Sequence, residues 1–147
     1  MITIRQITRD DLKDLSQLYD DLIDKKTNYK KLVEVFETIK SNDNYYILGA
    51  FKDSELVGSV MGIICQDIVG ECRPFMVIEN VIVSNHIRRQ GIGKKLMAKI
   101  EIIARDRNCY YIIFVSGGQR KEAHAFYEKL GFKDEKVEGY RKHFFED

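Results

Sequence analysis

The sequence of 147 residues has little excess charge, few cysteines and a single proline. Its formal net charge is only +1, whereas nucleic-acid-binding domains usually carry a clear basic excess, so no nucleic-acid partner is expected. Its three cysteines form no C-x-x-C pair, which is typical of a reduced, cytoplasmic protein whose cysteines are core or strand residues. No apolar run has the length of a membrane span or the pattern of a signal segment, so no membrane partner is expected.

The chain also lacks internal repeats, linkers and low-complexity segments. Hydrophobic residues make up 44% and charged residues 32%, which argues against a disordered chain and is ordinary for a globular one. We therefore expect residues 1–147 to form a single domain with a substantial core.

Hydrophobic periodicity predicts strands and helices along the whole chain. Residues 45–51 and 56–67 are expected to pair as an antiparallel hairpin, and 110–116 to form a central strand covered on both faces. The remaining strands are expected at residues 2–7, 75–83 and 137–145. Helices are expected over about 12–22, 29–40 and 122–130 and after residue 93. A Thr8-x-x-Asp11 capping box precedes the helix at 12–22. The helix at 29–40 is expected to bury Leu32, Val35, Phe36 and Ile39.

The segment from Val81 to Leu96 carries the strongest functional signal. An apolar strand leads through a polar turn into a basic helix whose start is marked by Gly91 and Gly93. The first turn of a helix offers free N–H groups and a partial positive charge, and glycines let a phosphate approach the backbone. The spacing differs from a P-loop, and Leu96 stands where a dinucleotide fingerprint needs its third glycine. The segment is therefore predicted to bind some other phosphate-containing ligand.

Two motifs together connect this segment to a known family. Arg88-x-x-Gly91-x-Gly93 resembles the Gln/Arg-x-x-Gly-x-Gly/Ala signature of the GNAT superfamily of acyl-coenzyme A N-acyltransferases. The later run from Ala123 to Phe132 is similar to the second signature of that family, a helix that ends Phe-Tyr-x-x-x-Gly-Phe. The resemblance implies an α/β domain with a mixed, mostly antiparallel central sheet flanked by helices. It also implies an enzyme that transfers the acetyl group of acetyl-coenzyme A, its cosubstrate, directly to a primary amine without a metal.

The resemblance also implies which residues contact coenzyme A. The main chain of the strand before the loop would pair with the amide groups of pantetheine, and the loop would surround the pyrophosphate. These cofactor-binding residues are Val81, Ile82, Val83, Arg88, Arg89, Gln90, Gly91, Ile92, Gly93 and Lys94. Arg120 stands where many relatives have an asparagine that contacts the cofactor. Arginine can donate hydrogen bonds but cannot accept them, so this contact is a departure from the family pattern.

Two side chains are candidates for proton transfer. An alkylammonium has no lone pair, so a base must remove its proton before attack, and Glu79 on the strand that leads to the loop could do so directly or through water. A solvent-facing carboxylate in an ion pair is the alternative reading of Glu79. Tyr127 occupies the family position of a tyrosine near the thioester sulfur, where a phenol can protonate the leaving thiolate. Its helical spacing also fits plain core packing.

Several functions and partners stay open at this stage. The acceptor is expected to be an amine of a small molecule or of a peptide or protein, and the resemblance allows a homodimer. A non-catalytic acyl-coenzyme A-binding or sensing module would keep the loop but need neither Glu79 nor Tyr127. A nucleotide-phosphate binder is disfavoured by the loop spacing.

Overall fold

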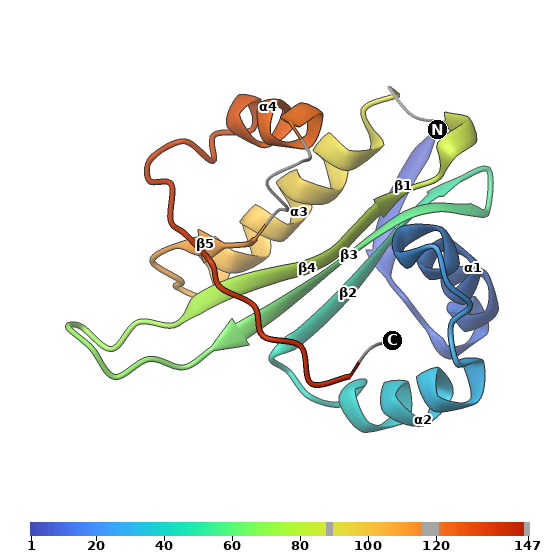
Figure 1. Cartoon of the computed structure of the whole chain (residues 1–147), viewed down its shortest axis with the longest axis horizontal. Coiled ribbons are helices and arrows are strands. Elements are labelled where there is room, and N and C mark those ends of the chain that lie inside the picture. Colours follow the sequence, from blue (N-terminus) through green and yellow to red (C-terminus); the bar gives the residue numbers. More distant parts are fainter. Residues whose placement is uncertain (88–89, 116–120, 146–147) are drawn as a thin grey trace. The chain divides into compact units, whose positions relative to one another are not determined.

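A computed structural model describes residues 1–87, 90–115 and 121–145 of the chain, which divides into two compact units, Met1–Phe114 and Val115–Asp147. Each unit is described by itself (Figure 1). The first unit contains β1 (Ile2–Gln6), α1 (Leu12–Ile23), α2 (Tyr29–Ile39), β2 (Tyr45–Lys52), β3 (Glu55–Cys65), β4 (Phe75–Val83), α3 (Ile92–Asp106) and β5 (Ile112–Ile113). The second contains α4 (Lys121–Lys129).

The sheet of the first unit follows the order of the chain, β1-β2-β3-β4-β5. The first four strands pair antiparallel, and β5 pairs parallel with β4. A two-residue turn joins β2 to β3, with φ of 51° at Asp53 and 73° at Ser54, the conformation that tight hairpins require. The prediction of a mixed, mostly antiparallel sheet flanked by helices is confirmed.

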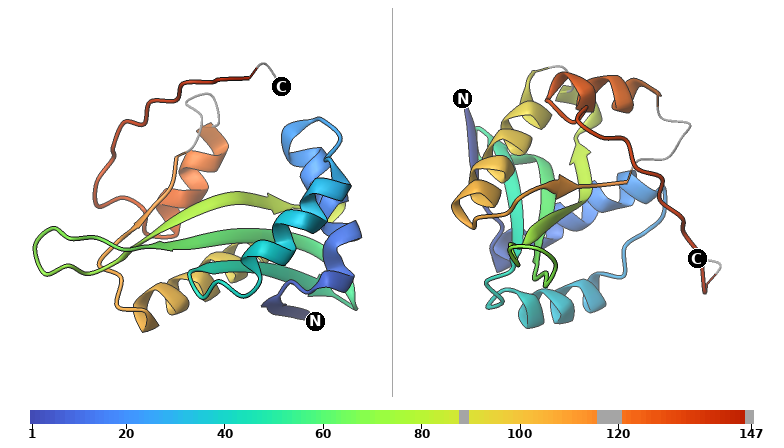
Figure 2. Two further views of the ribbon diagram at one scale, coloured as in Figure 1. Left: turned by 90° about the horizontal axis from the view of Figure 1, so that it is seen from below. Right: turned by 90° about the vertical axis from the view of Figure 1, so that its left-hand side faces the viewer.

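Helices cover both faces of the sheet, with α3 on one face and α1 and α2 on the other (Figure 2). On the first face α3 lies close to the strands because Gly58 and Gly62 have no side chain. A Cβ atom at Gly58 would be 3.0 Å from Ile92 Cγ2, and one at Gly62 would be 3.0 Å from Ile100 Cδ1. On the second face a core cluster is formed by Ile7, Leu12, Leu15, Leu18, Phe36, Phe51, Leu56 and Ile82.

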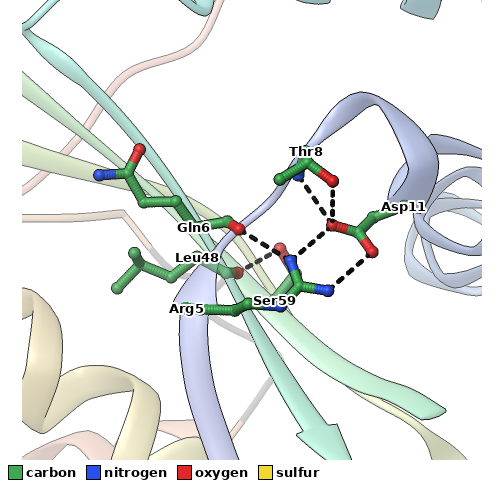
Figure 3. A network of polar contacts seen from close by, with 6 residues as sticks. All are labelled: Arg5, Gln6, Thr8, Asp11, Leu48 and Ser59. Carbon is green, nitrogen blue, oxygen red and sulfur yellow. Dashed lines mark hydrogen bonds and ion pairs between the residues drawn. The ribbon is translucent and has the colours of Figure 1, made fainter. Parts of the chain in front are cut away.

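The predicted capping box precedes α1 and is extended by an arginine (Figure 3). The Thr8 N–H donates to the Asp11 carboxylate at 2.8 Å, which satisfies a backbone donor at the helix start. The Arg5 guanidinium donates to both Asp11 oxygens, at 2.7 and 3.0 Å. This pairing joins β1 to the start of α1 and holds the pKa of Asp11 below its ordinary value.

Two predicted strands are corrected by the structure. Residues 110–116 were expected as a central strand, but only Ile112–Ile113 pairs, at the edge of the sheet among the described residues. The run is not covered on both faces either, since Tyr110 and Val115 are exposed. Apolar composition alone determines neither the neighbours of a strand nor its burial. Residues 137–145 form no strand, and Tyr140 and Phe144 are more than four-fifths exposed.

Smaller expectations also need correction. In α2, Phe36 is buried as expected, but Val35 is exposed. Of the cysteines, Cys65 lies in β3, whereas Cys72 is exposed in the loop between β3 and β4 and Cys109 lies outside any helix or strand. Within the part of the chain that the structure describes, no helix has the length and apolar character needed to cross a membrane.

Candidate active site

The start of α3 forms an open site for an anion. Gly91 has φ of 76° and precedes the helix, and its carbonyl accepts the first helical hydrogen bond from the Lys95 N–H at 3.0 Å. The N–H groups of Ile92, Gly93 and Lys94 lie in the first turn, before any helical acceptor is available, and the glycine cap has no side chain to satisfy them. Apart from the chain neighbours of Gly91, no atom of the described residues would lie within 4 Å of a Cβ atom at this position, so those residues leave space beside the cap. These features fit a phosphate group.

Gln90, which precedes the Gly91 cap, is hydrogen-bonded to the end of β2. Gln90 Oε1 accepts a hydrogen bond from Lys52 Nζ, at the end of β2, at 2.8 Å. Arg88 and Arg89, which were also predicted to contact the pyrophosphate, lie outside the described residues, as does Arg120.

A bulge in β4 determines where Glu79 lies. Glu79 is opposite Met61 of β3 and Ile82 is opposite Ser59, so the three-residue step from Glu79 to Ile82 spans only two residues of β3. The extra residue is accommodated at Asn80, whose φ is 56°. Residues three apart on a regular strand lie on opposite faces, but here both lie on the face covered by α1 and α2. Glu79 itself is exposed.

One backbone edge of β4 is open toward the helix start. On the β5 side, β4 pairs only at Met76 and Val77 in the part of the chain that the structure describes. From Ile78 to Val83 this edge therefore offers its N–H and C=O groups to a ligand. The segment includes Val81 and Val83, which are half-buried, and Ile82, whose side chain belongs to the core. It is followed by the turn that leads to Gly91.

A half-buried phenol, that of Tyr19, packs against the core cluster on the α1 face of the sheet and was not predicted. Tyr19 of α1 hydrogen-bonds Ser59, and Ser59 Oγ donates to the Leu48 carbonyl at 2.7 Å. Burial raises the pKa of Tyr19 to about 12, and the Ser59 hydrogen bond lowers it less than burial raises it, so the phenol stays neutral at physiological pH. Its place in the apolar stripe of α1 gave no signal that distinguishes it from an ordinary core residue.

Tyr127 lies in α4 of the second unit. It is half-buried, and its ring lies 5.5 Å from that of Phe126 and 6.4 Å from that of Phe132, measured between centroids. α4 ends at Lys129, and Gly131, the predicted C-terminal cap, follows with φ of 99°. The Phe132 N–H donates to the Tyr127 carbonyl at 3.1 Å, as in a glycine-capped helix end. The local structure of the second signature is thus a capped helix end with an aromatic cluster.

The model of the acetyltransferase (GNAT) family matches residues 9–132 of the chain. This range includes both motifs, the open edge of β4 and the start of α3. The chain belongs to the GNAT family. Family membership confirms the predicted class, an acetyl-coenzyme A-dependent N-acyltransferase that transfers an acetyl group to an amine.

Individual relatives agree with this assignment. Glucosamine 6-phosphate N-acetyltransferase 1 of Dictyostelium discoideum is 25% identical over 142 residues, which cover 93% of this chain and 88% of the relative. Among solved structures, a Bacillus halodurans protein described as a transcriptional regulator is 28% identical with a TM-score of 0.86, covering 98% of this chain and 100% of that chain. Aminoglycoside N-acetyltransferase AAC(6')-Iy, solved in complex with CoA, has a TM-score of 0.82 at 23% identity and covers 97% and 95% of the two chains.

Coenzyme A, the cosubstrate of the GNAT family, carries groups that fit both the β4 edge and the start of α3. The pantetheine arm carries amide groups that match a free strand edge, and the pyrophosphate matches a helix start. Among the described residues, no group of three or more histidine, cysteine, aspartate or glutamate side chains is arranged to hold a metal ion.

Proposed function

We propose that the chain transfers the acetyl group of acetyl-coenzyme A to a primary amine of a small molecule, with Glu79 as general base and Tyr127 as general acid. The observation that supports this most directly is the continuous run from the open edge of β4 to the glycine-capped start of α3. Val81 and Val83 would bind pantetheine through their main chain. Residues 88–94 would hold the pyrophosphate, with Arg120 as an additional contact.

The proposed reaction is a direct transfer between the two substrates. Glu79, directly or through one water, takes a proton from the ammonium, and the freed amine nitrogen attacks the thioester carbonyl. A C–N bond forms and the C–S bond breaks. Tyr127 donates its proton to the departing thiolate, and the attacking nitrogen then loses its second proton, which restores the Tyr127 phenol through solvent. The products are the acetylated amine and coenzyme A, and the proton taken by Glu79 passes to solvent. Holding both substrates in line supplies most of the rate, and the two proton transfers add to it.

Amino sugars are the acceptor class to test first. One relative is named for glucosamine 6-phosphate and one solved neighbour for aminoglycosides, and both names specify amines on sugar rings. Peptide and protein amines form the second class. A cytoplasmic location, a homodimer and a single domain stay predictions from the sequence.

The test combines calorimetry with a thiol-release assay. Acetyl-coenzyme A should bind with one site per chain, and one amine class should produce stoichiometric free thiol and acetylated product. Absence of acetyl-coenzyme A binding would contradict the proposal. The sensing-module alternative draws on the neighbour described as a transcriptional regulator. It predicts tight binding with no thiol release for any amine.

A further inference from the structure

The hairpin between β2 and β3 contacts both ends of the segment that connects β4 to α3. Lys52 and Glu55 lie opposite each other across the two-residue turn. Lys52 Nζ is 2.8 Å from Gln90 Oε1, and Glu55 Oε2 is 3.4 Å from His86 Nε2. The backbone adds a third contact, because the Ser84 N–H donates to the Val57 carbonyl at 2.8 Å. The hairpin therefore supports the segment that precedes the phosphate site.

The contact with Lys52 determines how the Gln90 amide is oriented. An ammonium group can only donate hydrogen bonds, so the amide must present its oxygen to Lys52. The Nε2 group, with its two N–H donors, is then directed away from Lys52. Because Gln90 immediately precedes the cap residue Gly91, those donors belong to the residue next to the first turn of α3.

The charges around the hairpin strengthen the case for Lys52. An open pocket of about 290 Å³ beside it is lined by Lys52, Asp53, Glu55, Val57, His86 and Ile87. Asp53 and Glu55 are both carboxylates and exposed. Lys52 therefore contributes an ammonium group to a pocket that also contains these two carboxylates and the His86 imidazole.

We propose that Lys52 is a positioning residue for phosphate binding, which fixes the Gln90 amide so that its N–H groups donate to the coenzyme A phosphates. This inference rests on the proposed function, because it takes the ligand of the α3 start to be coenzyme A. It adds Lys52, from outside the cofactor loop, to the residues proposed to hold the phosphates.

The test separates phosphate recognition from general stability by using two acetyl donors. Dissociation constants are measured by calorimetry for acetyl-coenzyme A, and kcat/KM is measured for acetyl-coenzyme A and for acetylpantetheine, which has no phosphate. The variants are Lys52→Met, Gln90→Ala, the double variant, and Lys52→Arg, which keeps a donor for the Gln90 oxygen. Lys30→Met, which removes an exposed ammonium from α2, is the matched control.

Lys52→Met is expected to weaken acetyl-coenzyme A binding by about threefold to tenfold, the range for loss of one charge-assisted hydrogen bond at a solvated site. Its kcat and its kcat/KM for acetylpantetheine should stay within about twofold of the unmodified protein. Lys52→Arg should restore binding, Lys30→Met should leave it unchanged, and the double variant should bind no more weakly than Gln90→Ala alone.

Two results would overturn the inference while leaving the proposed function intact. One is unchanged acetyl-coenzyme A binding in Lys52→Met. The other is an equal loss with acetylpantetheine, because a purely structural effect of the hairpin would not depend on phosphate. Failure of the unmodified protein to bind acetyl-coenzyme A would overturn the proposed function and this inference together.

Discussion

At the scale of single residues, the bulge at Asn80 determines which groups of β4 can meet a substrate. Its φ of 56° lies in the left-handed region, which asparagine adopts more readily than other residues with a side chain. The bulge places the Glu79 carboxylate on the same face as Ile82. A regular strand would have directed one of them toward α3 instead.

Substitutions at Asn80 should therefore act through backbone conformation. Asn80→Gly is expected to keep stability and activity, because glycine adopts this conformation freely. Asn80→Val should lower the free energy of unfolding by about 1–2 kcal/mol, because a β-branched residue resists a positive φ. Urea unfolding measures the stability of both variants, and acetyl-transfer assays measure their activity. Equal stability of the two variants would contradict a role for the positive φ at residue 80.

Tyr127 belongs to the same scale, since its proposed role depends on one hydroxyl group. Tyr127→Phe keeps the ring that contacts Phe126 and Phe132 but removes the proton donor. We expect kcat to fall by about tenfold to a hundredfold, toward the lower end of general acid effects, with the dissociation constant of acetyl-coenzyme A unchanged. Steady-state kinetics and calorimetry measure the two quantities. Equal losses in both would count against the acid role.

At the scale of elements, the Asp11 network joins β1 to the start of α1. The side-chain hydrogen bond from Arg5 is the largest cause of the lowered pKa of Asp11, and the Thr8 backbone N–H also lowers it. The Asp11 side chain is only 12% exposed, so solvent screens this ion pair less than an ordinary surface pair. The network should therefore stabilise the placement of α1 over the sheet.

Asp11→Asn tests this network through its pH dependence. A carboxylate whose pKa is lower in the folded state stabilises the fold above its unfolded pKa, and this stabilisation is lost as the pH falls toward the folded value. At pH 7 the variant should be less stable by about 1–2 kcal/mol. The difference should shrink below the ordinary carboxyl pKa of 3.8. Urea titrations at several pH values measure this difference in the free energy of unfolding, and Asp10→Asn, at an exposed position, is the control. A difference independent of pH would contradict a stabilising role of the ionised Asp11 carboxylate.

The packing of α3 on the sheet gives a second prediction for elements. At Gly58 an added Cβ would lie 3.0 Å from Ile92 Cγ2 and 3.1 Å from the Ile82 carbonyl, under the first turn of α3. Gly58→Ala should cost about 1–3 kcal/mol of stability and, by moving that turn, also weaken acetyl-coenzyme A binding. Gly62→Ala is the matched control, because it meets Ile100 about two turns further along. It should destabilise similarly without changing binding, and equal effects on binding would contradict the local explanation.

At the scale of the whole molecule, the two units differ in how much regular structure they contain. The first has the five-stranded sheet and three α-helices, whereas residues 133–145 of the second form neither helix nor strand. Tyr140, Phe144 and Phe145 are at least 80% exposed.

Hydrogen exchange should reflect this difference. Amides of β2, β3 and α3 are expected to exchange slowly, because they lie in paired strands or in a packed helix. Amides of residues 133–145 are expected to exchange within seconds in the protein without ligand. Exchange measured by mass spectrometry on peptides from the intact chain checks this. Strong protection of residues 133–145 would contradict the structure of that segment.

The sequence predicted those parts of the fold that depend on local pattern. Periodicity located α1, α3 and the β2–β3 hairpin, and the glycine spacing located the start of α3 correctly. It failed where a strand needs a distant partner, because apolar residues at 110–116 and 137–145 do not specify what pairs with them. The bulge at Asn80 was also missed, since reading a strand by alternation assumes that no residue is inserted. Lys52 was missed because it contacts Gln90, a residue 38 positions further along the sequence.

The inserted residue in β4 has a consequence for how this chain can change during evolution. Losing one residue between Glu79 and Ile82 would remove the bulge, because the two would then be two residues apart and would keep the same face and the same partners, Met61 and Ser59, on a regular strand. Such a deletion would change the backbone at Asn80, where the positive φ would no longer be needed, and would leave Ile82 in the core cluster. We therefore expect this strand to tolerate the loss of this one residue better than a one-residue deletion in its regular part, which would exchange its two faces.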